Sequence, residues 1–375
     1  MTLITSISLN GFRNYAGASV DGLGMPFIVL VGDNGAGKTN CLEAISLLSP
    51  GRGLRSASVS DMQSQHNHQP WAVSAKITDR DGDTIQMGVG RDPQKPDKKI
   101  IRADGTTLKN QDEVGEILRC VWLTPHMDDL FTQPTAERRR FFDRLVATYD
   151  PSHSGRMTRY EKATRERLNL LRDEAEKGKA ADTLWLSSLE NIMAETSVAI
   201  AAARMDVLDT LQKTISKNCG DDFPIAELSL IGDVETALES SSALSVEDMI
   251  REKLSAFRNA DGQTGRTNFG IGRTDVRATY VDKNADAAQC STGEQKGLLT
   301  TMILAHARMV AARFGVPPIL LFDEIAAHFD SRRRNSLLDL LSDLKGQVWL
   351  SGQDEQSFSH LENKRIIRIE NNQLL

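Results

Sequence analysis

The chain has 375 residues, of which 40% are hydrophobic and 26% are charged, and its formal net charge is −6. These values describe an ordinary globular protein, and they exclude a chain that is disordered throughout or coated in positive charge. They leave room for a local basic patch.

The four cysteines lie far apart and form no C-x-x-C pair. That spacing favours buried or free thiols in a reducing compartment over a disulfide framework or a zinc site. The first residues show no basic segment followed by an apolar one, and no apolar run approaches the ~20 residues needed to span a bilayer. We therefore expect a cytoplasmic protein with no membrane partner.

A glycine-rich stretch near the start fits the phosphate-binding pattern G-x-x-x-x-G-K-[ST]: Gly32-Asp33-Asn34-Gly35-Ala36-Gly37-Lys38-Thr39. A β-prone apolar run precedes it at residues 27–31, and leucine and isoleucine recur at helical spacing after it. Because strand, glycine turn and helix come in the order that a nucleotide site requires, we favour this function over a glycine turn that binds nothing. The loop's backbone N–H groups would surround phosphate, Lys38 would reach the β- and γ-phosphates of ATP, and Thr39 would bind Mg²⁺.

The middle of the chain predicts short strands and then helices. Asp81-Gly82-Asp83 is a turn signal, and residues 121–123 form a further short strand. His66 and His68 lie in a polar loop, which we interpret as surface and not as a metal site. From residue 136 the leucine and isoleucine spacing predicts helices, with a break near Lys177-Gly178, and residues 261–273 have the composition of a return linker.

The apolar run from Pro317 ends in Asp323 and Glu324. This pattern fits a Walker B strand inside a parallel sheet. Asp323 would hold Mg²⁺ through water, and Glu324 would polarise the attacking water. The alternative is a buried strand followed by an acidic loop, which the P-loop makes the weaker interpretation.

Ser291 and Glu294 form a capping box at the start of a helix, whose apolar residues we place on one face: Leu298, Leu299, Met302, Ile303, Met309 and Val310. A well-capped helix is one interpretation. The same residues fit S-x-G-[EQ], the signature of ABC-type ATPases, in which Ser291 and the Gly293 amide would meet the γ-phosphate of a nucleotide held by another subunit.

Two further stretches stand where ABC-type ATPases have their D-loop and their switch: residues 327–330, and Ser351-Gly352-Gln353, which should sense the γ-phosphate. This order predicts an α/β fold with an ABC-type P-loop ATPase head built from both chain ends. We expect residues 1–135 and 263–375 to form the head and residues 136–262 to form an inserted, mostly helical arm. The signature implies a head-to-head, ATP-dependent homodimer with two ATP molecules between the subunits.

Several stretches resemble the RecF family of bacterial recombination-mediator ATPases: residues 8–15, which include Gly11-Phe12-Arg13-Asn14-Tyr15, and residues 42–45, 51–56, 124–125, 128–130, 138–139, 141–143 and 273–275. The interval between Lys38 and Ser291 is too long for a transporter subunit and lacks the long coiled coils of SMC proteins. The resemblance implies a slow Mg²⁺-dependent ATPase of DNA replication, repair and the SOS response to DNA damage. It also implies DNA binding as an ATP-bound dimer, at gaps and at junctions between double and single strands, and loading of RecA together with RecO and RecR.

The basic residues offer candidate DNA-phosphate contacts of their own: Arg52, Arg55, Lys98, Lys99, Arg138 and Arg139, with Arg140 and Arg332 to Arg334 as further clusters. For any one cluster, a solvated charged face is the commoner alternative. We find no aromatic ladder on which single-stranded bases could stack, which favours contact with duplex or junction backbone without sequence preference.

Two other functions remain open. The loosened D-loop and switch also fit a scaffold in which nucleotide is mainly structural and partner binding is the main activity. A transport or translation ATPase of the ABC class would need a transmembrane partner or a ribosome contact, and the long interval between the motifs speaks against it.

Overall fold

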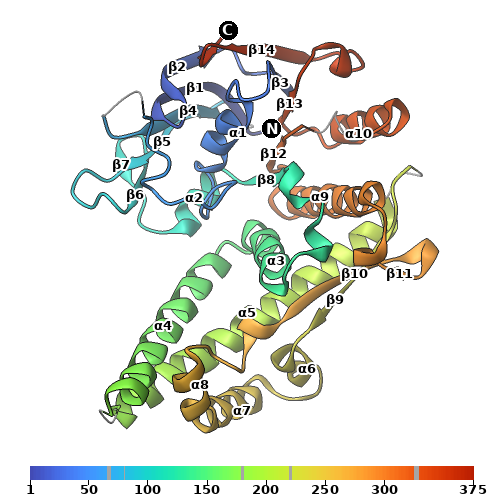
Figure 1. Ribbon diagram of the computed structural model, residues 1–375. Helices are drawn as coiled ribbons and strands as arrows, with labels where there is room; N and C mark the ends of the chain where they lie inside the picture. Colours follow the sequence, from blue (N-terminus) through green and yellow to red (C-terminus); the bar gives the residue numbers. More distant parts are fainter. Residues whose placement is uncertain (66–68, 80, 179–180, 219–221, 325–328) are drawn as a thin grey trace. The chain divides into compact units, whose positions relative to one another are not determined.

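The computed structural model describes residues 1–65, 69–79, 81–178, 181–218, 222–324 and 329–375 (Figure 1). By its internal contacts the chain divides into two compact units. Unit 1 comprises Met1–Asp129, Thr214–Ile225 and Ser291–Leu375, and unit 2 comprises Leu130–Lys213 and Ala226–Cys290. The expected domain limits at residues 135/136 and 262/263 stay a prediction. The histidines of the polar loop, His66 and His68, lie outside the described residues.

The first sheet of unit 1 carries the nucleotide motifs. Its strand order is β15-β14-β3-β13-β12-β8, and all neighbouring strands are parallel except β15. The bounds are β3 (Phe27–Val31), β8 (Cys120–Leu123), β12 (Ile319–Phe322), β13 (Val348–Gly352), β14 (Lys364–Glu370) and β15 (Gln373–Leu374). Every residue of β3, β8, β12 and β13 is buried, as expected where both faces of a parallel sheet are covered.

The second sheet of unit 1 is antiparallel, in the order β2-β1-β4-β5-β6-β7. Its strands are β1 (Leu3–Phe12), β2 (Tyr15–Asp21), β4 (Ala72–Thr78), β5 (Thr84–Arg91), β6 (Lys99–Ala103) and β7 (Thr106–Thr107). The predicted turn between β4 and β5 is confirmed, because one carboxylate oxygen of Asp79 accepts hydrogen bonds from the backbone N–H groups of Asp81 and Asp83, at 2.8 and 3.0 Å.

One apolar core connects both sheets of unit 1 through the helix that follows the P-loop, α1 (Lys38–Ser46). Leu42 and Ile45 of α1 belong to the same buried cluster as Ile7 of β1, Ile28 of β3 and Trp349 of β13. A helix packed in this way has little freedom to move. The start of α1 is therefore a rigid support for a ligand.

The helix that begins at the signature is α9 (Thr292–Phe314), and unit 1 also contains α2 (Gln111–Ile117) and α10 (Ser331–Asp343). The six apolar residues that we placed on one face of α9 are all buried, and burial extends beyond that face, because the buried residues run almost without interruption from Gln295 to Val310. Residues 222–225 account for part of this additional burial, since the hydroxyl of Thr301 donates a hydrogen bond to the Pro224 carbonyl at 2.9 Å. His306 is fully buried, as expected for a residue packed in this helix.

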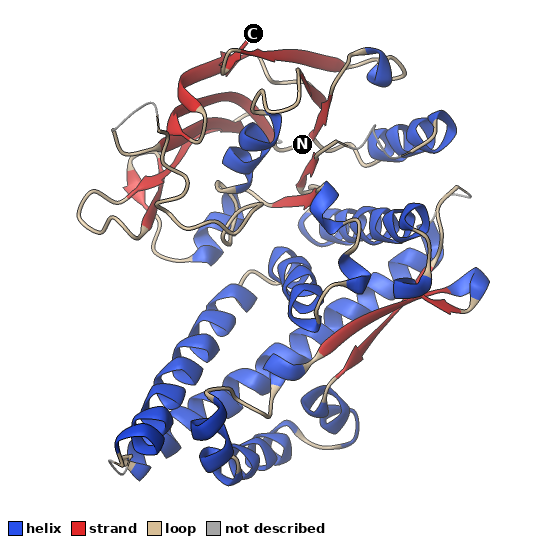
Figure 2. Cartoon of the chain, in the orientation of Figure 1, coloured by secondary structure: helices blue, strands red, loops and turns tan. Residues whose placement is uncertain are grey.

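Unit 2 is mainly helical, with a three-stranded antiparallel sheet in the order β11-β10-β9 (Figure 2). Its elements are α3 (Thr135–Tyr149), α4 (His153–Lys177), α5 (Thr183–Asn218), β9 (Ala226–Ile231), α6 (Asp233–Ser240), α7 (Ala243–Ala256), α8 (Arg258–Thr264), β10 (Asp275–Tyr280) and β11 (Ala285–Asp286). The last residues of α5, from Thr214, are assigned to unit 1. The predicted break near Lys177-Gly178 is confirmed, because α4 ends there and Gly178 has a left-handed φ of 64°.

Buried charges hold the helices of unit 2 together. The guanidinium of Arg167 on α4 donates hydrogen bonds to Asp261 at 2.7 Å, to Glu190 at 2.9 Å and to the Leu254 carbonyl at 2.6 Å. The predicted return linker begins at Asp261, and that interpretation is wrong for residues 261–264, which belong to α8. The polar composition misled the prediction because the carboxylate of Asp261 is buried against Arg167 and not exposed to water.

Arg204 on α5 is the centre of a second buried group in unit 2. It pairs with Asp143 through two hydrogen bonds, at 2.8 and 2.9 Å, and it donates to the Ile271 carbonyl at 3.0 Å. Burial alone would raise the pKa of Asp143, but the charge of Arg204 and the neighbouring His153 hold it at about 2.

None of the described helices is both long and apolar enough to cross a membrane.

Candidate functional site

The P-loop connects β3 to α1, and its glycines have conformations that other residues rarely adopt. Gly32 has a φ of 155° and Gly37 a φ of 118°. A Cβ atom on Gly32 would lie 2.6 Å from the Ile369 carbonyl, and one on Gly37 would lie 2.6 Å from the amide of Asn14. Glycine is therefore required at both positions, and the loop can present backbone N–H groups at the start of α1, where the helix dipole favours phosphate.

Lys38 directs its ammonium group back into the loop. Its Nζ atom donates hydrogen bonds to the carbonyls of Gly32 at 2.7 Å and Asp33 at 2.9 Å, and the side chain is almost fully buried. The ammonium is thus held within the loop that would surround the phosphates, as expected for the lysine of a P-loop.

Two residues at the start of β2, Asn14 directly before the strand and Tyr15 as its first residue, support the P-loop. Tyr15 donates a hydrogen bond from its hydroxyl to the Gly37 carbonyl at 3.0 Å. Asn14 donates to the Ala36 carbonyl at 3.1 Å and accepts from Asn40 of α1 at 2.7 Å. These bonds fix the C-terminal half of the loop from outside. The signal in the sequence is the stretch Gly11-Phe12-Arg13-Asn14-Tyr15, which resembles the RecF family.

A buried carboxylate anchors α1 to the same stretch. Glu43 is fully buried and is bound by Arg13, through two hydrogen bonds at 2.6 and 2.9 Å, and by Arg55 at 2.7 Å. Arg13 has a left-handed φ of 54°, which points to a conformation that its surroundings enforce. The turn after β1 and the segment after α1 are therefore connected through one buried charge.

Replacing Tyr15 with phenylalanine is expected to weaken ATP binding by roughly fivefold, because one hydrogen bond to the loop, of about 1 kcal/mol, is lost without opening a large cavity. The dissociation constant of ATP, measured by titration calorimetry, checks this. Tyr280→Phe, on β10 of unit 2, is the matched control and should leave the constant unchanged. An unaltered affinity in Tyr15→Phe would mean that Gly37 is held without this hydroxyl.

The metal side of the site joins residues that are far apart in the sequence. Thr39 donates a hydrogen bond from its hydroxyl to Asp323 Oδ2 at 2.8 Å. This hydrogen bond places a hydroxyl that could bind Mg²⁺ beside a carboxylate that would hold the ion through water. Thr39 and Asp323 would hold the ion, which would supply charge neutralisation at the phosphates.

Glu324 follows Asp323 at the end of β12 and is half-buried. Its φ is 51°, in the left-handed region, which is unfavourable for a residue with a long side chain. Its backbone N–H donates a hydrogen bond to the hydroxyl of Ser351 at 2.8 Å. Strained residues of this kind concentrate at functional sites, which agrees with the role assigned to Glu324.

The signature residues lie at the N-terminus of α9. Ser291 is exposed and forms the predicted capping box, in which its backbone N–H donates to Glu294 at 2.9 Å. Gly293 has open space where a Cβ would stand. In the described part of the chain the hydrogen bonds of Ser291 run to its own helix start, so the structure does not bring it onto the P-loop of the same chain.

The D-loop position is only partly described, because residues 325–328 lie outside the described ranges. Phe329 packs edge-on against Phe223 with ring centres 5.9 Å apart, and Asp330 caps α10 through the N–H of Arg333 at 2.9 Å. At the switch position, Gln353 donates a hydrogen bond to Asn34 of the P-loop at 3.3 Å. The end of β13 thus contacts the P-loop.

The candidate DNA contacts in unit 1 differ in their exposure and in the partners of their side chains within the protein. Arg52 and Lys98 are exposed. Arg55 is exposed in part and is paired with Glu43. Lys99 donates to the Gly51 carbonyl at 2.6 Å, and burial lowers its pKa to about 8. A phosphate would have to displace that internal partner, which argues against Lys99 as a DNA contact.

The two candidates in unit 2 are also engaged. Arg138 pairs with Asp275 at 2.8 Å, and both side chains are mostly buried. Arg139 donates to the Thr274 carbonyl at 2.8 Å, and burial lowers its pKa. These partners tie α3 to β10, which argues for a structural role of both arginines and against a role in DNA binding.

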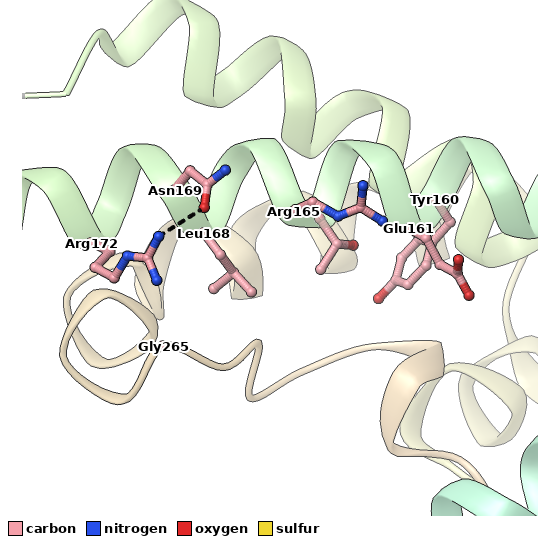
Figure 3. A pocket seen from close by; sticks show the side chains of 8 residues that line it. Tyr160, Glu161, Arg165, Leu168, Asn169, Arg172 and Gly265 are labelled. Atoms are coloured by element: carbon pink, nitrogen blue, oxygen red, sulfur yellow. Dashed lines mark hydrogen bonds between the residues drawn. The ribbon is translucent and has the colours of Figure 1, made fainter. Parts of the chain in front are cut away.

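A hollow of about 380 Å³ lies along α4 in unit 2 (Figure 3). Arg165, Asn169 and Arg172 of α4 are among the residues that line it, and Arg172 donates a hydrogen bond to Asn169 at 3.2 Å. None of the predicted site residues lines this hollow. The nucleotide motifs are all in unit 1.

A parallel sheet with a P-loop, a Walker B strand and a capped signature helix defines an ABC-type ATPase head. The family profile described as "RecF/RecN/SMC N terminal domain" matches residues 3–374. The "DNA replication and repair protein RecF" of Mesorhizobium japonicum is 43% identical over 363 residues, covering 96% of this chain and 94% of that protein. The protein of the same name from Caulobacter vibrioides is 39% identical, with 97% and 95% covered. This chain belongs to the RecF family.

Solved structures agree at the level of the fold. A structure described as "recombination mediator protein RecF-ATP in RecFOR pathway" matches with a TM-score of 0.86 and 21% identity, over 100% of this chain and 97% of that one. An Smc head domain with an extended coiled coil, from Pyrococcus furiosus, matches with a TM-score of 0.53 and 16% identity. The expected fold class, an α/β ABC-type ATPase head, is confirmed.

Proposed function

We propose that this chain is an ATP-driven DNA clamp of replication and recombinational repair. Two copies close on two ATP molecules, with Ser291 and Gly293 of one copy meeting the nucleotide in the P-loop of the other. The closed homodimer holds DNA at gaps and at junctions between double and single strands, and with RecO and RecR it helps to load RecA. Slow hydrolysis, with Glu324 as the base, opens the dimer and releases the DNA.

The observation that carries this proposal is the pairing of Thr39 with Asp323 at 2.8 Å, which joins the P-loop to the Walker B strand. The names of the relatives support the DNA role, and the ATP named for a related structure supports the nucleotide. Cys41 and Cys120 are buried free thiols, which supports a cytoplasmic location. Exposed Arg52 and Lys98 are the basic residues that we retain as DNA contacts.

The decisive test is the mass of the protein in solution, measured by light scattering with and without Mg-ATP and a gapped duplex. Wild type should be a dimer with ATP, and that dimer alone should hold the DNA. Ser291→Arg should stay a monomer and lose at least tenfold in DNA retention, because a long charged side chain fills the position that faces the partner's phosphate.

Ser359→Arg is the control, since Ser359 is an exposed serine of unit 1 outside every motif. It should behave as wild type. A wild-type monomer under every condition would overturn the clamp and leave the scaffold as the better function. A Ser291→Arg protein that still dimerises with ATP would overturn the role of the signature.

A further inference from the structure

Ser351 lies near the end of β13, between the strand of the P-loop and the Walker B strand. β13 pairs with β3 on one side and with β12 on the other, and Ser351 stands opposite Leu30 in the first of these ladders. The side chain is fully buried. A buried hydroxyl requires partners, and those of Ser351 are the two acidic residues of the site.

The direction of both hydrogen bonds follows from the chemistry of the groups. The backbone N–H of Glu324 can only donate, so the oxygen of Ser351 accepts at 2.8 Å. The single hydrogen of the hydroxyl is then directed to Asp323 Oδ1, at 2.6 Å. One hydroxyl therefore bridges the side chain of Asp323 and the backbone of Glu324.

These bonds fix both carboxylates. Asp323 has Ser351 on Oδ1 and Thr39 on Oδ2, so the plane of its carboxylate is set and Oδ2 is directed to the metal side. Glu324 has a left-handed φ of 51°, a conformation that persists only when its surroundings hold it. The bond from its N–H to Ser351 is a direct restraint on that backbone.

A phosphate-sensing role fits Ser351 less well than its neighbour Gln353. The Ser351 hydroxyl has one hydrogen, which it donates to Asp323. It could not donate to a phosphate without giving up that hydrogen bond. Gln353 is exposed and already reaches Asn34 of the P-loop at 3.3 Å. At this end of β13, Ser351 therefore contacts the acidic residues and Gln353 contacts the P-loop.

We propose that Ser351 is a positioning residue, whose hydroxyl holds the metal-binding carboxylate of Asp323 and the backbone of Glu324 in a single arrangement for hydrolysis. The inference rests on the proposed function in that hydrolysis uses these two carboxylates. It predicts that removing the hydroxyl slows ATP turnover but leaves nucleotide binding nearly unchanged, because the P-loop contacts do not involve Ser351.

The test compares Ser351→Ala and Ser351→Thr with wild type and with Ser49→Ala. Ser49 is a matched control, because it is buried and its hydroxyl donates to the Ser46 carbonyl at 2.8 Å. Ser351→Ala should lower kcat for ATP about tenfold and leave KM within twofold, and the Mg²⁺ concentration for half-maximal rate should rise. Ser351→Thr, which keeps the hydroxyl, should restore most of kcat, and Ser49→Ala should match wild type.

A second readout does not need turnover. Hydrogen exchange at the Glu324 amide, followed by mass spectrometry, should be slow in wild type and Ser351→Thr and at least tenfold faster in Ser351→Ala. Slow exchange in all variants, or a Ser351→Thr protein as impaired as Ser351→Ala, would overturn the proposal. If wild type proved unable to hydrolyse ATP, the proposed function would fail while the exchange measurement still decided the role of Ser351.

Discussion

Replacing Glu324 with glutamine is expected to lower ATP turnover by about 100-fold or more, because the amide cannot accept the proton of the attacking water. The substitution keeps the size of the side chain and the backbone bond to Ser351, so the Thr39–Asp323 contact should remain. ATP should still bind, and the closed dimer should accumulate and retain DNA longer. Phosphate release and dimer lifetime, measured on the same preparation, check both parts.

Glu355→Gln provides the control for this experiment. Glu355 lies after β13 and accepts a hydrogen bond from Arg368 at 2.8 Å, outside the site. It should hydrolyse ATP at the wild-type rate. Turnover of Glu324→Gln within threefold of wild type would show that Glu324 is not the base, and an unchanged dimer lifetime as well would favour the scaffold.

The largest loss of stability is expected from Arg167→Ala, at about 3–5 kcal/mol, because removing one partner of a buried ion pair leaves an uncompensated charge. The Arg167 side chain is inaccessible to water, and so is that of its partner Asp261. Glu190 keeps Arg258 as a partner, so the main uncompensated charge is that of Asp261, whose side chain retains, among the described residues, only the neutral Asn268 as a hydrogen-bond donor. Urea unfolding followed by far-ultraviolet circular dichroism measures the change.

Two further variants separate the buried charge from lost packing. In Arg167→Ala combined with Asp261→Asn, the loss should be smaller than the sum of the single losses, because the uncompensated carboxylate is gone. Arg159→Ala removes an exposed ion pair with Glu195 and should cost less than about 1 kcal/mol. Equal losses for Arg167→Ala and Arg159→Ala would contradict the account of unit 2.

The parts of the site that could be predicted from the sequence are those formed by residues close together in the chain. The P-loop glycines, the end of the Walker B strand and the capping box of Ser291 each depend on neighbours a few positions away, and a residue pattern records such neighbours directly. Their order was sufficient to predict the fold class.

The missed contacts join residues that are distant in the sequence. Tyr15 at the start of β2 reaches Gly37 beyond β3, and Ser351 in β13 reaches Asp323, which precedes α10. The all-round burial of α9 was missed for the same reason, since residues 222–225 pack on it from another part of the chain. The burial of Asp261 could not be predicted, because a carboxylate in a polar segment has the same sequence signal whether it is solvated or paired in the interior.

The strand order of the first sheet also constrains how the protein is made. β3 pairs with β13 and β14, and both are synthesised after residue 347. At about 10 residues per second, the strand before the P-loop waits roughly half a minute on the ribosome with both edges unpaired. During that time the chain has its glycine loop but no complete sheet, so a product that terminates early would expose two open strand edges and be prone to aggregation. Only a chain translated nearly to its last strand can complete the nucleotide site.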